Sequence, residues 1–355
     1  MKHIISIIAC LLLHSTYYSQ QAVSDSLMKY IQLNPKKCAY FVIKNNSQLA
    51  AHNAANIVPI GNASHYLVAL EFAKQATYKV IDTAELVPLK DIVKYYLPST
   101  TIDHYDDWFA QLLLQKKIVN NSVTLLQVVH GMLEYDVVAN AEYLMDRLGF
   151  DNIKSSIQSY NLTGHTSILP PVGAIALFQN RNHTTEKKIL KEINNMSEEG
   201  YCKLAFMMHN AIKNDSTFKQ KMPNKMVTNK VLNKYYNRLP QGSTKAYATL
   251  LQTILDEAML DAKYYKMLRV VLEPNKGMYN SLERIAAYTS YTSNSATYVG
   301  YSKAYTGNQA ISIALSLYNL TAAELSNIQR WLVPFSIAVR ENDIVQKQLQ
   351  YLKIK

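Results

Sequence analysis

One stretch, residues 58–70, constrains the fold more than any other because it predicts a helix that is buried on several sides. The stretch runs VPIGNASHYLVAL and continues into further apolar residues up to Phe72. A surface helix carries apolar residues on one face only, with a spacing near 3.6 residues. The apolar residues here do not keep that spacing. We therefore expect a proline-led turn followed by a central helix around which the rest of the chain packs.

Length and composition indicate a globular protein with a sizeable core. The chain has 355 residues, 48% of them hydrophobic, which suffices for one large domain or two subdomains. The net charge is +11, with lysine and arginine scattered along the chain. This charge favours weak attraction to anionic envelope polymers or membrane surfaces. The chain has no nucleic-acid-binding motif, so we expect no nucleic-acid partner.

The first 20 residues predict a secretory signal peptide, with a basic start, a short apolar run and a polar end. Residues 7–10 also resemble a lipoprotein cleavage box, which would make Cys10 the lipidated first residue. The apolar run before Cys10 is short, which favours the plain signal peptide. No later stretch approaches the roughly 18 apolar residues of a membrane-spanning helix. We expect an exported protein, periplasmic or extracellular, that does not span the membrane.

Cysteine and histidine patterns predict no metal site. Beyond the signal, the chain keeps Cys38 and Cys202. They would be able to form one disulfide in an exported protein, but two buried free thiols are the favoured interpretation. The histidines are not spaced with acidic or cysteine residues as in zinc motifs, and no glycine-rich phosphate loop occurs. We expect no cofactor.

Both ends of the chain predict strands. Residues 38–44 and 48–52 form a hairpin around a turn. Residues 284–291, 295–302 and 309–318 alternate as an antiparallel meander. Between these two regions nearly all signals are helical, so the sequence predicts a sheet built from both chain ends and a large helical insertion.

This order of elements resembles the serine β-lactamase, penicillin-binding protein and DD-peptidase superfamily. There, a proline-hydrophobic-small run leads into Ser-x-x-Lys at the start of the central helix. Here Asn62 takes the serine position and His65 takes the lysine position. The resemblance covers residues 35–340 in order, through short local matches.

Two more superfamily motifs are matched by their surroundings and not by their catalytic groups. Asp136-Val137-Val138 stands in place of Ser-Asp-Asn, and Tyr288-Thr289-Ser290 in place of Lys-Thr-Gly, so only Thr289 is kept. In class A β-lactamases a loop glutamate activates the deacylating water. No glutamate lies between residues 161 and 185.

The resemblance implies that the catalytic nucleophile and base of the superfamily are missing from this chain. A serine hydroxyl is a poor nucleophile near pH 7 without a neighbouring base. Asn62 and His65 keep the spacing of the pair, and we expect a hydrogen bond between them, but a carboxamide does not attack acyl groups. Ser64 and His65 are weak substitutes, because adjacent helical residues point about 100° apart. We expect Ser64 to satisfy an amide at the start of the helix.

Backbone groups of the cleft offer two alternatives. Oxyanion holes in the superfamily use backbone amides, which here would belong to Asn62 and Tyr291. A cleft that keeps these donors would bind a carboxylate or carbonyl without turning it over. Alternatively, Tyr288 and Tyr291 fill the cleft.

We therefore predict an α/β (α+β) fold of the β-lactamase and transpeptidase type, with a five-stranded antiparallel sheet flanked by helices and an all-helical subdomain. The single domain covers residues 21–355. Its α/β part comprises 21–60 and 265–355, and its helical part comprises 61–264.

The predicted function is that of an exported, catalytically inactive homologue of these serine hydrolases, which binds or scaffolds a peptidoglycan peptide or an envelope protein. One alternative is an active hydrolase of β-lactams or peptidoglycan-peptide amides with relocated groups, drawn from Ser64, His65, Asp136, Thr289 and Ser290. A hydroxyl within reach of a histidine or lysine in an open cleft would favour it. The other alternative is an envelope protein whose cleft is filled and whose surface does the work.

Overall fold

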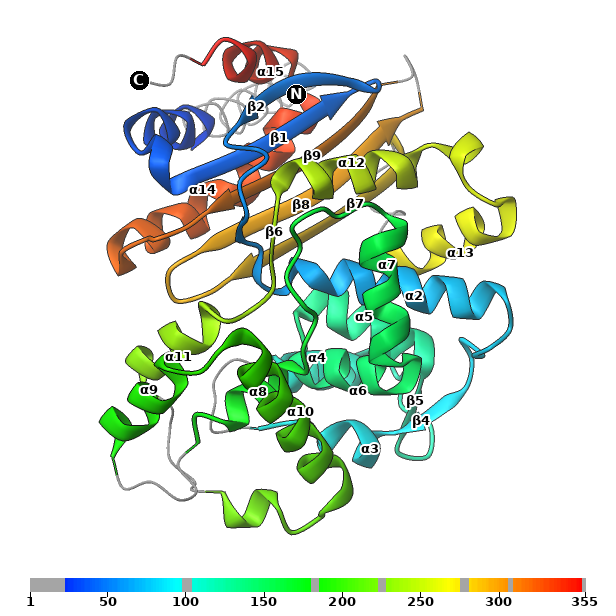
Figure 1. The fold of residues 1–355 in the computed structure, drawn as a ribbon. Coiled ribbons are helices and arrows are strands. Elements are labelled where there is room, and N and C mark those ends of the chain that lie inside the picture. The colour runs from blue at the N-terminus through cyan, green and yellow to red at the C-terminus, as the bar shows by residue number, and fades with distance from the viewer. Residues whose placement is uncertain are drawn as a thin grey trace, which may run out of the picture.

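The computed structural model describes residues 23–97, 104–179, 185–222, 228–274, 281–305 and 309–352. The predicted signal peptide and Cys10 lie outside the described residues. The described chain forms a sheet layer and a helical layer, with helix α2 (His65–Thr77) between them (Figure 1).

The sheet has five antiparallel strands in the order β2-β1-β9-β8-β7. Their bounds are β1 Cys38–Lys44, β2 Ser47–His52, β7 Leu282–Tyr291, β8 Ala296–Ala304 and β9 Ala310–Leu317. The prediction of a five-stranded antiparallel sheet from both chain ends is confirmed. Strand β7 lies at one edge, and this position brings it to the functional site.

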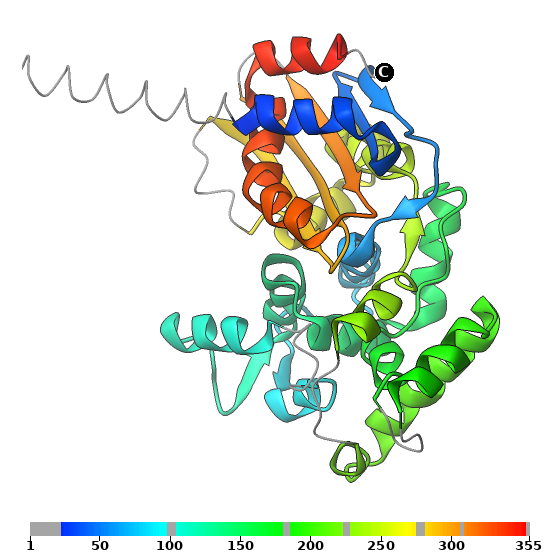
Figure 2. The ribbon, with the colours of Figure 1, turned by 90° about the vertical axis from the view of Figure 1, so that its left-hand side faces the viewer.

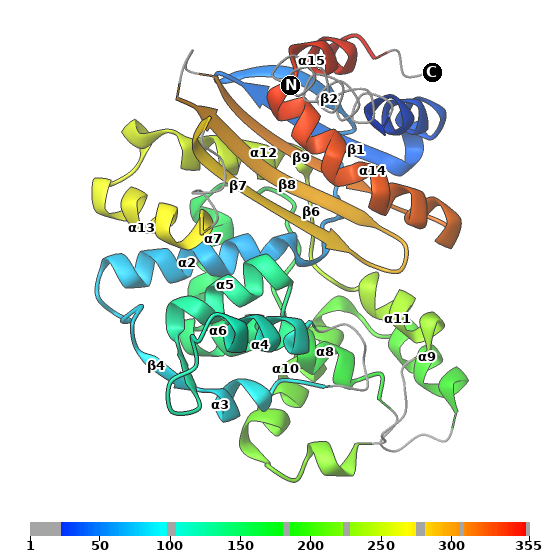
Figure 3. The same ribbon diagram turned by 180° about the vertical axis from the view of Figure 1, so that it is seen from behind.

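Helices cover both faces of the sheet, as the side view shows (Figure 2). Helices α14 (Ala322–Glu341) and α15 (Asp343–Gln350) and a helix over residues 23–33 lie on one face (Figure 3). Helix α12 (Thr244–Leu255) lies on the other face, where the hydroxyl of Ser312 in β9 donates to the carbonyl of Ala248. Helix α12 thus packs against the sheet, whereas the predicted division places it in the helical part 61–264.

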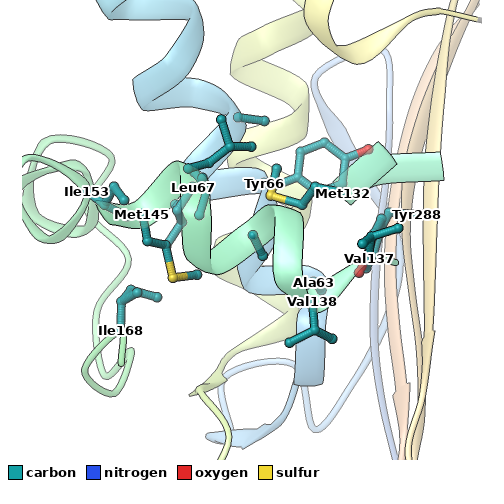
Figure 4. Packing of buried hydrophobic residues seen from close by; sticks show 14 of the residues in the cluster. Ala63, Tyr66, Leu67, Met132, Val137, Val138, Met145, Ile153, Ile168 and Tyr288 are labelled. Atoms are coloured by element: carbon teal, nitrogen blue, oxygen red, sulfur yellow. The ribbon is translucent and has the colours of Figure 1, made fainter. Parts of the chain in front are cut away.

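Helix α2 is the central buried helix that the sequence predicts. All its residues except Lys74 and Thr77 are buried. Its side chains pack against the sheet and the helical layer in one continuous cluster, part of which Figure 4 shows. Burial on several sides explains why its apolar residues lack a single-face spacing.

The helical layer surrounds the far side of α2, and two short strand pairs lie outside the main sheet. The helices are α3 Leu89–Val93, α4 Tyr105–Leu114, α5 Leu125–Tyr135, α6 Val138–Leu148, α7 Phe150–Ser159, α8 Pro171–Ala176, α9 Glu186–Asn194, α10 Glu198–Asn214 and α11 Asn229–Tyr236. Helix α13 (Ala262–Leu272) lies beside α2 on the side of the sheet layer (Figure 1). The pairs are β3 Val58–Pro59 with β6 Gln241–Gly242, and β4 Leu86–Pro88 with β5 Ser122–Thr124. None of the helices within the described ranges is long and apolar enough to cross a membrane.

Cys38 and Cys202, the two cysteines that follow the predicted signal peptide, are free thiols. Cys38 is buried in β1, and Cys202 in α10 is half-buried. The predicted unpaired state is confirmed for both, whereas full burial holds for Cys38 alone.

Candidate functional site

Three segments that carry the predicted motif positions meet at the start of α2. They are the tight turn Gly61–Ser64, the C-terminal end of α5 and the edge strand β7. Oδ1 of Asp136 accepts a hydrogen bond from Nδ2 of Asn62 at 2.9 Å and another from the hydroxyl of Tyr288. Nδ1 of His65 lies 3.1 Å from the same hydroxyl. We call Asn62, His65, Asp136 and Tyr288 the Asp136 network.

Local backbone geometry places the carboxylate at the centre of this network. Asp136 ends α5 in the left-handed conformation, with φ at 55°. Aspartate tolerates this conformation better than most residues. The chain then turns into α6, whose first residue, Val138, is buried in the main core near Tyr288 (Figure 4). Val138 stands where the Ser-Asp-Asn motif has its asparagine, and here this side chain packs in the core.

Hydrogen-bond donors in the network determine the tautomer of His65. The single hydroxyl proton of Tyr288 goes to Asp136, so Nδ1 of His65 must carry a proton to bond the tyrosine oxygen. Burial lowers the pKa of His65 to about 3, which keeps the ring neutral. The predicted hydrogen bond between Asn62 and His65 is wrong, because their side chains bond Asp136 and Tyr288 instead.

The carboxyl group of Asp136 has a shifted pKa. Burial raises this pKa to about 6, while the hydrogen bonds from Tyr288 and Asn62 oppose the shift. The Asp136 side chain keeps 21% of its surface exposed. At neutral pH the network therefore contains one ionised acceptor held by two donors.

The serine positions do not provide an activated hydroxyl. Oγ of Ser64 is buried and donates to the carbonyl of Gly61 at 3.2 Å, so the predicted bond to a helix-start amide is wrong. Oγ of Ser290 accepts from the backbone amide of Asn62 at 3.2 Å. In the described part of the chain, no histidine or lysine side chain hydrogen-bonds Ser64, Ser290 or Thr289. The hydrolase alternative thus lacks the geometry that would favour it.

One of the two predicted oxyanion donors is occupied, since the amide of Asn62 bonds Ser290. Gly61 permits this close approach: its φ is +52°, and an added Cβ would lie 2.9 Å from Oγ of Ser290. Tyr291 ends β7 opposite Ala296, and its ring packs against the cluster on the α14 side of the sheet. Tyr288, with 3% exposure, therefore fills the cleft without Tyr291.

A groove beside the network runs along the edge of β7. It encloses about 310 Å³. Its lining comes from the ends of α5 and α13, from β7 and from α14: Leu133, Glu134, Asp136, Leu272, Glu273, Pro274, Ile285, Ala286, Ala287, Tyr288, Thr289 and Arg340. Asp136, Tyr288 and Thr289 of the predicted site line this groove, which makes it the open part of the site.

Arg340 in the groove wall carries a buried charge without a carboxylate. Its side chain is 7% exposed, and its Nη1 has no hydrogen-bond partner among the described residues. Its Nε lies 3.4 Å from the carbonyl of Ser336, and its guanidinium lies 6.0 Å from the ring centroid of Tyr298. A buried guanidinium normally has an anionic partner. Nothing in the sequence around Arg340 marks it, so the sequence analysis missed it.

A second group that the sequence analysis missed is an ion-pair cluster in the helical layer. Glu142 of α6 accepts from the backbone amides of Val172 and Gly173 at the start of α8, and from Nδ1 of His209 at 2.8 Å. Burial disfavours the charged imidazole, but hydrogen bonds to Asp146 and Glu142 raise the pKa of His209 to about 9. Glu142 of α6 is thus hydrogen-bonded to both α8 and α10, and it fixes the start of α8 through the amides of Val172 and Gly173.

Comparison with known proteins identifies the fold. No protein-family profile and no curated protein sequence matches the chain. Among solved structures, a class A β-lactamase from Bacteroides cellulosilyticus DSM 14838 aligns with a TM-score of 0.54 at 10% identity, over 93% of this chain and 98% of that one. A β-lactamase from Chitinophaga pinensis DSM 2588 aligns with 0.52 at 10% identity, over 89% and 99%. One from Xanthomonas campestris pv. campestris aligns with 0.51 at 10% identity, over 90% and 98%.

Proposed function

We propose that this chain, whose fold is that of the class A β-lactamases, is a catalytically inactive binding or scaffolding protein of the cell envelope. Its ligand is a peptide that lies in the groove beside β7. One observation carries the proposal of inactivity: the groups at the motif positions bond to one another and not toward a substrate.

Each catalytic role of the superfamily has a specific obstacle here. The nucleophile position holds Asn62, whose side chain donates to Asp136 and whose amide donates to Ser290. The base position holds His65, whose pKa burial lowers to about 3, so it is too weak a base to take the proton of a hydroxyl. The bond from Asn62 to the Asp136 carboxylate contributes roughly 1.5–3 kcal/mol, and the bond to Ser290 joins neutral groups and contributes roughly 0.5–1.5 kcal/mol, so freeing Asn62 would cost about 2–4.5 kcal/mol.

Peptide binding is supported by the edge strand and by Arg340. The outer edge of β7 presents backbone N–H and C=O groups that an extended peptide can pair with. Arg340 supplies a guanidinium that matches a carboxylate. A peptidoglycan stem peptide combines an extended backbone with free carboxylates, and a carboxylate-bearing segment of an envelope protein has the same chemistry. The predicted signal peptide would deliver the protein to either ligand.

Sedimentation with purified peptidoglycan sacculi tests this proposal. We expect the wild-type protein to pellet with sacculi and the muropeptide masses to stay unchanged. Arg340→Met should weaken binding about tenfold or more, because losing a charged hydrogen bond costs at least about 1.5 kcal/mol. Arg330→Met is the matched control, since Arg330 is exposed on the same helix and its loss changes the net charge equally.

Three outcomes would contradict the proposal. A wild-type protein that stays in the supernatant would exclude sacculi as the ligand. Equal weakening by both arginine variants would show that binding depends on net charge and not on the groove. Cleaved muropeptides would show a hydrolase.

A further inference from the structure

A second cavity lies apart from the Asp136 network, where the first turns of α10 face the chain that follows α11. It encloses about 270 Å³, less than a pocket for a drug-sized ligand. Its lining residues are Thr166, Ser167, Leu169, Glu198, Tyr201, Cys202, Asn237, Arg238, Leu239 and Gln241. None of them belongs to the groove beside β7, so the inference drawn from this cavity goes beyond the proposed function.

Two opposite charges line this cavity without pairing. Nη2 of Arg238 donates to the carbonyls of Ile193 and Met196 at 3.1 and 2.8 Å, which fixes the guanidinium beside the cavity. Glu198 is exposed at the start of α10. In the described part of the chain no ion pair within 4.0 Å joins Glu198 to Arg238 or to any other cation. Both charges nevertheless lie close enough to Cys202 to shift its pKa in opposite directions, beside the larger effect of burial.

A buried hydroxyl in the same lining also lacks a partner. Tyr201 is 1% exposed, and its hydroxyl has no hydrogen-bond partner within the described residues. The guanidinium of Arg238 lies 5.2 Å from the centroid of the Tyr201 ring. A buried hydroxyl without a partner is unfavourable, so this wall of the cavity carries an unsatisfied polar group.

We infer that this cavity binds a free α-amino acid. The carboxylate of the amino acid bonds Arg238, which the ring of Tyr201 supports, and its ammonium group faces Glu198. Leu169 and Leu239 provide an apolar contact for its side chain. A zwitterion satisfies both unpaired charges at once, whereas a simple anion would meet the carboxylate of Glu198 and a simple cation would meet Arg238.

Cys202 provides a local probe for this site in the full chain. It lines the cavity and is half-buried, whereas Cys38 is fully buried and serves as an internal reference. The rate of Cys202 alkylation by iodoacetamide at pH 8.5 is followed by peptide mass spectrometry, with each free L- and D-amino acid added in turn. At ten times its Kd an amino acid leaves about one site in eleven open, so alkylation should slow about tenfold.

Charge-deleted ligands and a matched pair of variants complete the test. The N-acetylated and amidated forms of the protecting amino acid should protect at least about tenfold more weakly, because each lacks one charge. Glu198→Gln should weaken protection by the free amino acid to a similar degree. Glu199→Gln changes a neighbouring exposed carboxylate outside the cavity and should leave protection unchanged.

The inference is overturned if no free amino acid protects Cys202 in folded protein. It is also overturned if the N-acetylated form protects as well as the free one, or if Glu198→Gln and Glu199→Gln behave alike. Because this assay reports on Cys202 alone, its failure leaves the sacculus-binding result untouched.

Discussion

Replacement of Asp136 by asparagine should stabilise the protein at neutral pH. The asparagine keeps an acceptor oxygen for Asn62 and Tyr288 but cannot ionise. In the wild-type protein, burial raises the pKa of Asp136 from 3.8 to about 6. Below pH 3.8 the carboxyl is protonated in both the folded and unfolded states, and above pH 6 the folded state carries the full cost of a buried charge.

The size of this cost follows from the pKa shift. A shift of about 2.2 units, at about 1.36 kcal/mol per unit, gives about 3 kcal/mol. The free energy of unfolding of Asp136→Asn, relative to wild type, should therefore rise by about 2.4 kcal/mol between pH 4 and pH 7, because part of the difference is already present at pH 4. His65 titrates over an overlapping range, because burial lowers its pKa to about 3. Because His65 titrates in both proteins, its contribution cancels in the difference in free energy of unfolding between Asp136→Asn and wild type.

Urea unfolding of both proteins, at intervals from pH 4 to pH 7.5, measures this difference. Glu257→Gln, which neutralises an exposed carboxylate, is the control and should show a flat difference. A flat difference for Asp136→Asn would refute the buried, shifted carboxylate. A difference that falls as pH rises would show that the folded state stabilises the ionised form.

Two other variants test the buried hydrogen bonds by urea unfolding. Tyr288→Phe removes a donor to the carboxylate and leaves Nδ1 of His65 without an acceptor, so it should cost about 2–4 kcal/mol, whereas Tyr351→Phe at an exposed site should cost almost nothing. Glu142→Gln removes one of the two carboxylates bonded to the His209 cation and leaves Asp146 in place, so it should cost about 1.5–3 kcal/mol at pH 7. Because the pKa of His209 is raised to about 9, this cluster stabilises the fold fully below pH 6.5 and its contribution is lost as pH rises through 9. A Glu142→Gln cost that is the same at pH 7 and at pH 10 would contradict the charged state of His209.

The elements of the fold could be predicted because local pattern determines them. Strand alternation at both chain ends gave the five strands, and the continuous apolar run of α2 gave its burial. The layer in which a helix packs is not a local property. The apolar face of α12 fits a sheet as well as another helix, so the sequence alone grouped it with the helical part that ends at residue 264.

The three segments that meet at the start of α2 were all singled out from the sequence, but the hydrogen bonds between them were not. Asn62 lies in a tight turn before α2, so the helical spacing that predicted a bond to His65 does not apply. The ionised carboxylate of Asp136, far along the chain, is a stronger acceptor than a neutral imidazole and takes the bond. Arg340 and the pair Glu142 and His209 likewise depend on contacts between distant segments.

The most direct test of the central claim is to incubate purified, folded protein with a fluorescent penicillin and then measure its intact mass. A penicillin-reactive serine enzyme serves as the positive control. Since Asn62 has no hydroxyl and Ser64 and Ser290 are not activated, the account predicts an unchanged mass and no fluorescent band. A stable adduct with the mass of the added penicillin would contradict the account, and peptide mapping of that adduct would identify the nucleophile.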